Sequence, residues 1–415
     1  MFPGVPKWAT NALFTGGPDV GSPTKAKPSS GQEDEGYERL DRPAAQRWNF
    51  WRWAIASLSI SCASSHVANW EKTDTSVIDL VTSAMPEVAA YDSAQDTWWV
   101  VAAPGPVAAE ELYSVGGLTN WAGAAAGPWA GLVLPRDCDV DPAGVRAVTF
   151  FDAADLIYTT PAGYPGVYVL WAGLPGPGLI WEKVAHDHIG LWVFADQNGV
   201  LYNSTGPAVA VAPVAVGPGF AAAIPIALEH SRHAALDVWD QDPGNPVWLA
   251  MTATEISTSA DGLSWTPAAL HGIPTPARGL AYSKPTTKWG IIEGTAGNAQ
   301  FHYSTDNGLT WTAGAVIDAT FGAISNTHLQ CDGFGHWVAV IADAVISPKI
   351  YASADDGDTW YEIHMPATWP PAAGAILNSI PTAYGGGRFM IFTGDNAGLP
   401  PGNTFNFFAS NRYLG

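Results

Sequence analysis

The amino-acid sequence predicts an all-β fold over most of the chain, a β-propeller spanning residues 66–415. After residue 75, short apolar runs alternate with turns rich in Gly, Asp, Asn and Pro, and no long helical pattern appears. The 44 glycines and 33 prolines are frequent enough to separate many short strands. Two sequence patterns also recur at intervals that match one four-stranded blade, roughly 40–50 residues.

The first pattern is an aromatic residue followed by an aliphatic or β-branched run. Its copies begin at Trp99, Trp192, Trp248, Trp289, Trp337 and Phe389, with a weaker copy at Leu156-Ile157-Tyr158. The copies are spaced by about one blade length, so the sequence predicts seven blades. The steps on either side of the weak copy are uneven, which leaves six or eight blades as alternatives.

The second pattern is a turn sequence. Two full copies consist of Ser304, Asp306, Gly308, Thr310, Trp311 and of Ser353, Asp355, Gly357, Thr359, Trp360, and a shorter copy has Ser259, Asp261, Gly262, Trp265. A degenerate copy, Ser114 to Trp121, keeps the frame and loses the Asp. In such a turn the carboxylate can accept backbone N–H groups, Gly supplies a positive φ, and the Trp ring can wedge between neighbouring sheets.

This Ser-x-Asp-x-Gly-x-Thr-Trp unit resembles the Asp-box of the sialidase-like propeller superfamily. The resemblance implies a structural role at the outer blade turns, away from the central channel. It implies no single activity, because this fold serves sialidases, photosystem assembly factors, sorting receptors and virion proteins.

A catalytic sialidase is not expected. That family carries a Phe-Arg-Ile-Pro-like motif that supplies one arginine of a carboxylate-binding triad, and no such motif occurs here. The arginines of the propeller region are Arg136, Arg146, Arg232, Arg278, Arg388 and Arg412, none of them in that context. We therefore expect a protein that is not an enzyme, with a glycan-processing enzyme as the alternative.

The N-terminal 65 residues form a second predicted domain. Residues 1–40 are rich in Gly, Pro, Ser, Lys and Glu and would be extended or disordered alone. Residues 41–62 read as a helix, capped by Asp41 with Pro43 in its first turn. We expect the aromatic face of this helix to be a virion-docking or oligomer interface; the alternative is that it packs on its own domain. The interface would consist of Trp48, Asn49, Phe50, Trp51, Trp53, Ile55 and Leu58.

This segment resembles the opening of many tailed-phage virion proteins. The shared elements are Gly36-Tyr37, Asp41-Arg42-Pro43-Ala44-Ala45 and Trp48-Asn49-Phe50-Trp51, with Leu40-Asp41 in place of the usual Gly-Glu. In those proteins the arm docks on the particle and a distal domain faces outward. The resemblance implies a tail-associated appendage or receptor-binding protein located in the virion and assembled in the host cytoplasm, with a capsid decoration protein or head fibre as the alternative.

Partners follow from the same resemblance and from charge. Residues 1–65 would bind other virion proteins or further copies of the chain, and the propeller would contact a host surface glycan or protein. The formal net charge of −20 disfavours nucleic-acid binding. No apolar run is long enough for membrane insertion.

No metal or cofactor is expected. Asp137, Asp139 and Asp141 alternate as at the start of a calcium loop, but no closing Glu follows at the right distance, so a solvated acidic turn is the simpler interpretation. His186-Asp187-His188 could offer two ligands to a metal and has no third ligand nearby in the sequence. The three cysteines, Cys62, Cys138 and Cys331, match no zinc or disulfide pattern.

Overall fold

The computed structural model divides the chain into two units, residues 1–65 with residue 415, and residues 66–414. It describes residues 70–72, 85–103, 110–116, 119–124, 135–150, 157–160, 169–171, 179–205, 214–215, 220, 224, 226–231, 247–273, 277–295, 298–320, 324–343, 348–363, 365, 380–394 and 405–410. All of these belong to the second unit. The predicted arm, the predicted helix and the interface residues from Trp48 to Leu58 lie outside the described residues.

The described part of the chain is built from strands, which form seven four-stranded sheets. The first four sheets contain β2 (Met85–Asp92), β3 (Thr97–Ala103), β4 (Glu110–Val115) and β5 (Ala122–Ala124); β6 (Pro135–Val140), β7 (Arg146–Phe150), β8 (Ile157–Thr160) and β9 (Val169–Leu170); β10 (Trp181–His186), β11 (Trp192–Asp196), β12 (Leu201–Ser204) and β13 (Val214–Ala215); β14 (Ala227–His230), β15 (Trp248–Met251), β16 (Glu255–Ser259) and β17 (Ala269–Leu270). The last three contain β18 (Ala277–Ser283), β19 (Lys288–Thr295), β20 (Asn298–Ser304) and β21 (Thr312–Asp318); β22 (Ile324–Cys331), β23 (Trp337–Asp343), β24 (Lys349–Ser353) and β25 (Tyr361–Glu362); β26 (Thr382–Gly385), β27 (Arg388–Gly394), β28 (Phe405–Ser410) and β1 (Trp70–Lys72).

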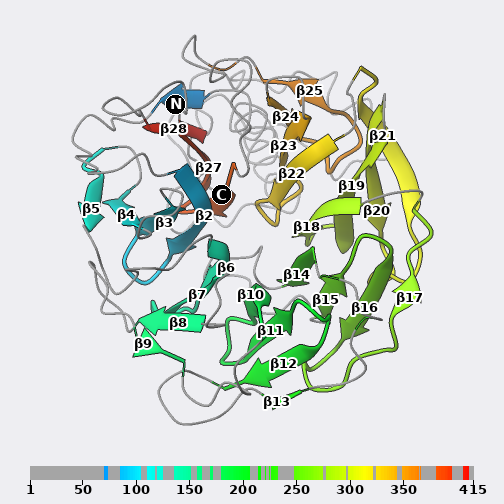
Figure 1. Ribbon diagram of the computed structural model, residues 1–415. Helices are drawn as coiled ribbons and strands as arrows, with labels where there is room; N and C mark the ends of the chain where they lie inside the picture. Colours follow the sequence, from blue (N-terminus) through cyan, green and yellow to red (C-terminus); the bar gives the residue numbers. More distant parts are fainter. Residues whose placement is uncertain are drawn as a thin grey trace, which may run out of the picture. The chain divides into compact units, whose positions relative to one another are not determined.

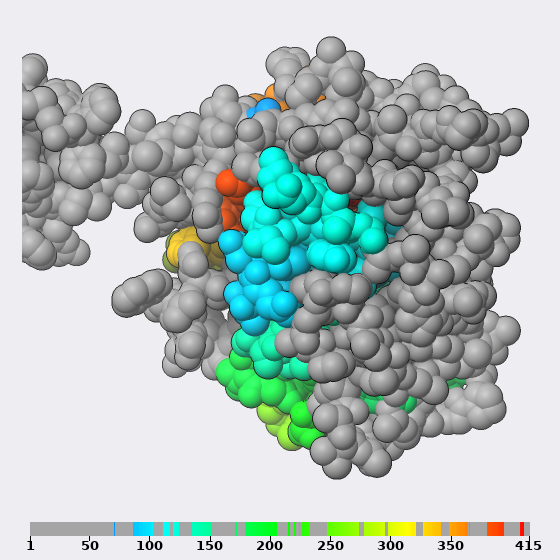
Figure 2. Space-filling model, turned by 90° about the vertical axis from the view of Figure 1, so that its left-hand side faces the viewer, coloured from blue at the N-terminus to red at the C-terminus, as the bar shows by residue number. Residues whose placement is uncertain are grey.

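The sheets form a closed ring (Figure 1). The innermost strands β2, β6, β10, β14, β18, β22 and β26 touch in that order, and β26 touches β2. Figure 2 shows the same junction from the side, where red atoms of the C-terminal strands adjoin the cyan and blue atoms of the first sheet. This arrangement is a β-propeller, and the prediction of an all-β propeller is confirmed.

The hydrophobic core lies between sheets rather than at a single centre. Seven clusters of buried side chains each combine residues from two adjacent sheets, and one of them joins the first sheet to the last. In that cluster Trp98 and Trp121 pack with Phe392 and Phe407. Every sheet is therefore held on both faces by its neighbours, as ring closure requires.

Two strands from opposite ends of the described chain complete the last sheet. β28 pairs with β27 on one side and with β1 on the other, with Trp70 opposite Ser410. The sequence itself predicts a closing strand at residues 404–410, with residues 76–80 as its partner; residues 76–80 lie outside the described residues. The described partner is Trp70–Lys72 instead, a strand too short to leave an alternating pattern in the sequence.

One copy of the aromatic pattern was wrongly placed. Ile157–Thr160 is β8, the third strand of its sheet, whereas the other copies lie in second strands. The equivalent second strand, β7, begins at Arg146, which pairs with Thr160 just as Trp192 pairs with Ser204. The error arose because Arg146 occupies the position that is aromatic in the other sheets, and this shift also explains the uneven spacing.

Within the described part of the chain, no helix is long and apolar enough to cross a membrane.

Candidate functional site

The three turns predicted from the Ser-x-Asp pattern join third and fourth strands, at the perimeter of the ring. Asp306 Oδ1 accepts the N–H of Thr310 at 2.8 Å, and its Oδ2 accepts the Thr310 hydroxyl at 2.5 Å. Ser304 Oγ donates to Asp306 at 2.7 Å and accepts the N–H of Gly308 at 2.8 Å. Although partial burial raises the pKa of Asp306, the donated hydrogen bonds outweigh it and lower the pKa below its ordinary value.

The other two turns have the same hydrogen bonds with small changes. Asp355 accepts the N–H of Thr359 at 2.9 Å and its hydroxyl at 2.5 Å. In the shorter turn Asp261 accepts two N–H groups, those of Leu263 at 2.9 Å and Ser264 at 2.8 Å. The hydrogen bonds described for these three carboxylates lie within their own turns, so the carboxylates serve the fold and are remote from the inner strands.

The tryptophans that end the three turns are equivalent in position. Each indole N–H donates to the carbonyl of the turn glycine, at 3.2 Å for Trp265 and at 3.1 Å for both Trp311 and Trp360. Each ring packs on the cluster shared with the preceding sheet. Trp265 is buried, whereas Trp311 and Trp360 are half-buried, less than a wedge between sheets would suggest.

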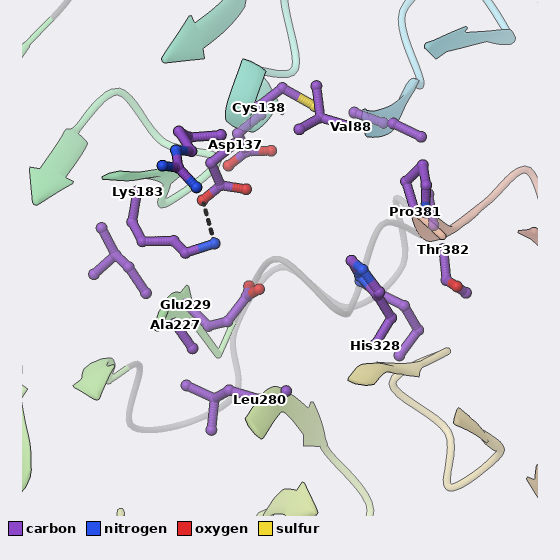
Figure 3. Close-up of a pocket in the computed structure, with 18 of the residues that line it drawn as sticks. Val88, Asp137, Cys138, Lys183, Ala227, Glu229, Leu280, His328, Pro381 and Thr382 are labelled. Atoms are coloured by element: carbon purple, nitrogen blue, oxygen red, sulfur yellow. Dashed lines mark ion pairs between the residues drawn. The ribbon is translucent and has the colours of Figure 1, made fainter. Parts of the chain in front are cut away.

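The functional candidate is the cavity enclosed by the inner strands. Its volume is about 420 Å³, and residues from all seven sheets line it. Figure 3 shows Asp137, Lys183, Glu229 and His328 directed into it from four different strands. The cavity is therefore walled largely by polar and charged side chains at the centre of the ring.

Bulges place three charges in a row along the cavity wall. The register of β2, β6 and β10 shifts around Glu87, Arg136 and Glu182, the second or third residue of each strand. Arg136 Nε lies 3.7 Å from Glu182 Oε2. Burial raises the pKa of Glu87 to about 7, against the opposing effect of the Arg136 guanidinium. The Glu87 carboxyl group, with a pKa of about 7, therefore titrates near neutral pH.

The aspartates proposed as a calcium loop or an acidic turn are separated by the fold. Asp137 and Asp139 lie on β6, where their Oδ2 atoms accept the N–H groups of Val184 at 3.1 Å and His186 at 2.7 Å on β10. They satisfy the otherwise unpaired edge of the neighbouring inner strand, so the acidic-turn interpretation was wrong for both. Only Asp141 caps a turn, accepting N–H groups of Ala143 and Val145.

The histidine pair also belongs to a turn. Asp187 Oδ1 accepts the N–H groups of Ile189, Gly190 and Leu191, all at 2.9 Å, and His186 Nδ1 accepts the N–H of His188 at 2.9 Å. Among the residues that the structure describes, no three His, Cys, Asp or Glu side chains are placed to hold a metal ion.

Sequence reasoning missed the cavity residues. A signal for three of them does exist: Glu87, Arg136 and Glu182 each precede by five positions an aspartate, namely Asp92, Asp141 or Asp187, that caps the turn after the inner strand. Their side-chain types differ from sheet to sheet, so a search for identical repeats passes over them.

No protein-family model and no curated protein matches the chain. Solved structures similar to it include YCF48 from Cyanidioschyzon merolae, with a TM-score of 0.55 and 14% sequence identity over 83% of this chain and 98% of that one. A structure of YCF48 bound to D1 peptide has a TM-score of 0.53 and 12% identity over 82% and 96% of the two chains. At such low identity the similarity establishes the fold alone.

Proposed function

We propose that this chain is a structural protein of a tailed-phage particle, anchored through residues 1–65 and presenting its β-propeller as a binding domain. The ordered series of sequence elements from Gly36 to Trp51 supports the virion assignment. We also infer that each four-stranded sheet is one blade, giving seven, and that the three perimeter turns are of the Asp-box type.

The observation that carries the binding role is the polar cavity at the inner strands, which residues from all seven sheets line. The first described strand, β1, is the outermost strand of its sheet, on the far side from β26, whose Thr382 and Ala383 line the cavity. The tail-associated position is the preferred assignment, with a capsid decoration protein or head fibre as the alternative, and host surface glycan or protein as the partner.

The test is incorporation into particles. Full-length protein and residues 66–415, both tagged, are expressed during infection, and purified particles are probed for each. We expect the full chain in the particles and the truncated propeller absent from them, while both are soluble in the lysate. Incorporation of the two at equal levels would refute the anchoring role, and labelling of intact virions separates tail from head.

A glycan-processing enzyme remains the second candidate because of Glu87. A carboxyl group with a pKa near 7 in a cavity is suited to act as a general acid at neutral pH. Incubation of the protein with host polysaccharide distinguishes the two proposals. Release of reducing sugar that is lost in Glu87→Gln would favour the enzyme, and binding without release would favour the binding domain.

A further inference from the structure

Arg278 is a cationic side chain of the cavity wall that has no counter-ion among the described residues. It lies at the start of β18, where the register shifts between Arg278 and Ala281. Its Nε is buried and has no hydrogen-bond partner among the described residues. Lys183 and Arg136, the other cations of the wall, face Asp137 and Glu182. An unpaired cation at a cavity wall costs free energy in the empty protein, and a ligand anion would relieve that cost.

A second polar group without a partner lies on the adjacent inner strand. Thr327, on β22, is only 7% exposed, lines the same cavity, and its Oγ1 has no hydrogen-bond partner among the described residues. The strands that carry Arg278 and Thr327, β18 and β22, approach each other closely. A Cβ on Gly279 would lie 2.9 Å from Leu329 Cβ and 3.1 Å from Leu329 N. Gly279 and Leu329 are the near neighbours of Arg278 and Thr327 in sequence.

We infer that Arg278 and Thr327 form a subsite for a single carboxylate. A guanidinium group presents paired N–H donors that match the two oxygens of a carboxylate, and a threonine hydroxyl adds a donor from the next strand. His328, which follows Thr327 and points into the cavity, contributes no second positive charge near neutral pH (Figure 3). Desolvation and the Lys183 ammonium group lower its pKa to about 4. The subsite therefore suits one negative charge rather than a phosphate dianion.

The surroundings of this subsite select the rest of the ligand. Glu87, Glu182 and Glu229 line the same cavity, and the whole chain carries a formal net charge of −20. A polymer with a carboxylate on every unit would bring several like charges near these residues. A peptide C-terminus has one carboxylate at its end and can be neutral or basic elsewhere. A cavity of about 420 Å³ is in the range of small-ligand sites and would accept its last residues.

The inferred ligand is therefore the C-terminus of a peptide or protein that is not acidic overall. This inference deepens the proposed binding role of the propeller, and it rests on that role. It is tested on the purified full-length protein, so its failure can be told apart from a failure of virion incorporation.

The probes are a matched pair of peptides, acetyl-Lys-Gly-Ser-Ala with a free carboxylate and the same peptide with a C-terminal amide. A third probe is a trimer of galacturonic acid. Binding is measured by isothermal titration calorimetry and by the shift in melting temperature. We expect the free acid to bind at least about tenfold more tightly than the amide, as loss of charge-assisted hydrogen bonds implies. The uronate should bind more weakly than the free acid.

Three variants identify the site. Arg278→Gln should abolish the preference for the free acid, and Thr327→Val should reduce it several-fold. Lys349→Gln, which removes a positive charge at the perimeter, should leave it unchanged. Arg278→Gln should also keep or raise the melting temperature of the empty protein, because the side chain makes no described interaction that stabilises the fold. Equal binding of acid and amide, preference for the uronate, absence of binding, or an unchanged preference in Arg278→Gln would each overturn the inference.

Discussion

Replacing Asp355 by Ala tests whether the perimeter turns stabilise the propeller. The change removes three hydrogen bonds to the carboxylate, from the N–H of Thr359 at 2.9 Å, from its hydroxyl at 2.5 Å and from the hydroxyl of Ser353 at 2.8 Å. Water can replace part of this because the turn is exposed, so we expect a loss of roughly 1–3 kcal/mol in the free energy of unfolding. The N–H of Thr359 is the group that loses its partner within the turn.

Asp358→Ala is the matched control, since Asp358 belongs to the same turn and its side chain is 73% exposed beside Lys288. Urea unfolding of both variants should give a clear loss for Asp355→Ala and a change of less than about 0.5 kcal/mol for the control. Burial opposes the lowering of the Asp355 pKa, but hydrogen bonds from Thr359 and Ser353 prevail. The stabilisation should therefore be complete above about pH 4 and decrease as pH falls through the lowered pKa. Equal effects of the two substitutions would refute the reasoning.

Three further outcomes are expected. Gly357→Ala should lower the free energy of unfolding by about 2–4 kcal/mol, because φ is +84° and the new Cβ would lie 2.4 Å from a ring atom of Phe301 in the preceding sheet. Gly116→Ala is the control, since Gly116 also has a positive φ, +72°, but open space around it. In the same denaturation assay it should cost only about 1–2 kcal/mol. Residues 66–415 should melt as one folded domain by circular dichroism, whereas residues 85–415, which lack β1, should melt at a clearly lower temperature or aggregate. Glu87→Gln should match the parent protein in stability at pH 4 and exceed it at pH 8 by about 1–3 kcal/mol. The reason is that the folded protein, in which the pKa of Glu87 is about 7, is destabilised relative to the unfolded chain as pH rises from 4 to 8 and Glu87 must ionise. Identical pH profiles of the two proteins in thermal melts would contradict this.

The fold was predictable because its repeat is imposed by packing that is the same in every sheet. Second strands are buried on both faces, so their aromatic and aliphatic runs recur at blade spacing. The turns recur because a carboxylate must satisfy their N–H groups. Partner choice in ring closure was not predictable, because a three-residue strand such as Trp70–Lys72 is defined by its hydrogen bonds to β28 and not by a pattern of its own.

The candidate site was less predictable than the fold for a physical reason. Cavity-lining residues are not required to pack identically, so each inner strand carries its own side chains. Asp137 illustrates the difficulty: in sequence it belongs to an acidic cluster, whereas in the structure its carboxylate serves the edge of β10. Arg278 leaves no pattern in the sequence, because what distinguishes it is a buried Nε without a hydrogen-bond partner among the described residues.

Arg146 shows how a repeat can persist when its most visible residue is replaced. Its side chain is fully buried at a position held by Trp in most other sheets, with Nη1 2.6 Å from Glu111 Oε1 and the guanidinium carbon 5.3 Å from the centre of the Trp99 ring. A flat guanidinium group stacked on an indole can fill much of the space of an aromatic ring, provided that a carboxylate neutralises it. Glu111 of the preceding sheet supplies that carboxylate. In the backbone register, the residue opposite this position is of a hydroxyl-bearing type in this sheet as well, Thr160 here and Ser in other sheets. A search that scores only hydrophobicity fails at this sheet. A search that requires a hydroxyl-bearing residue across the strand pair, and accepts Arg together with a Glu in the neighbouring sheet, would include β7 among the second strands.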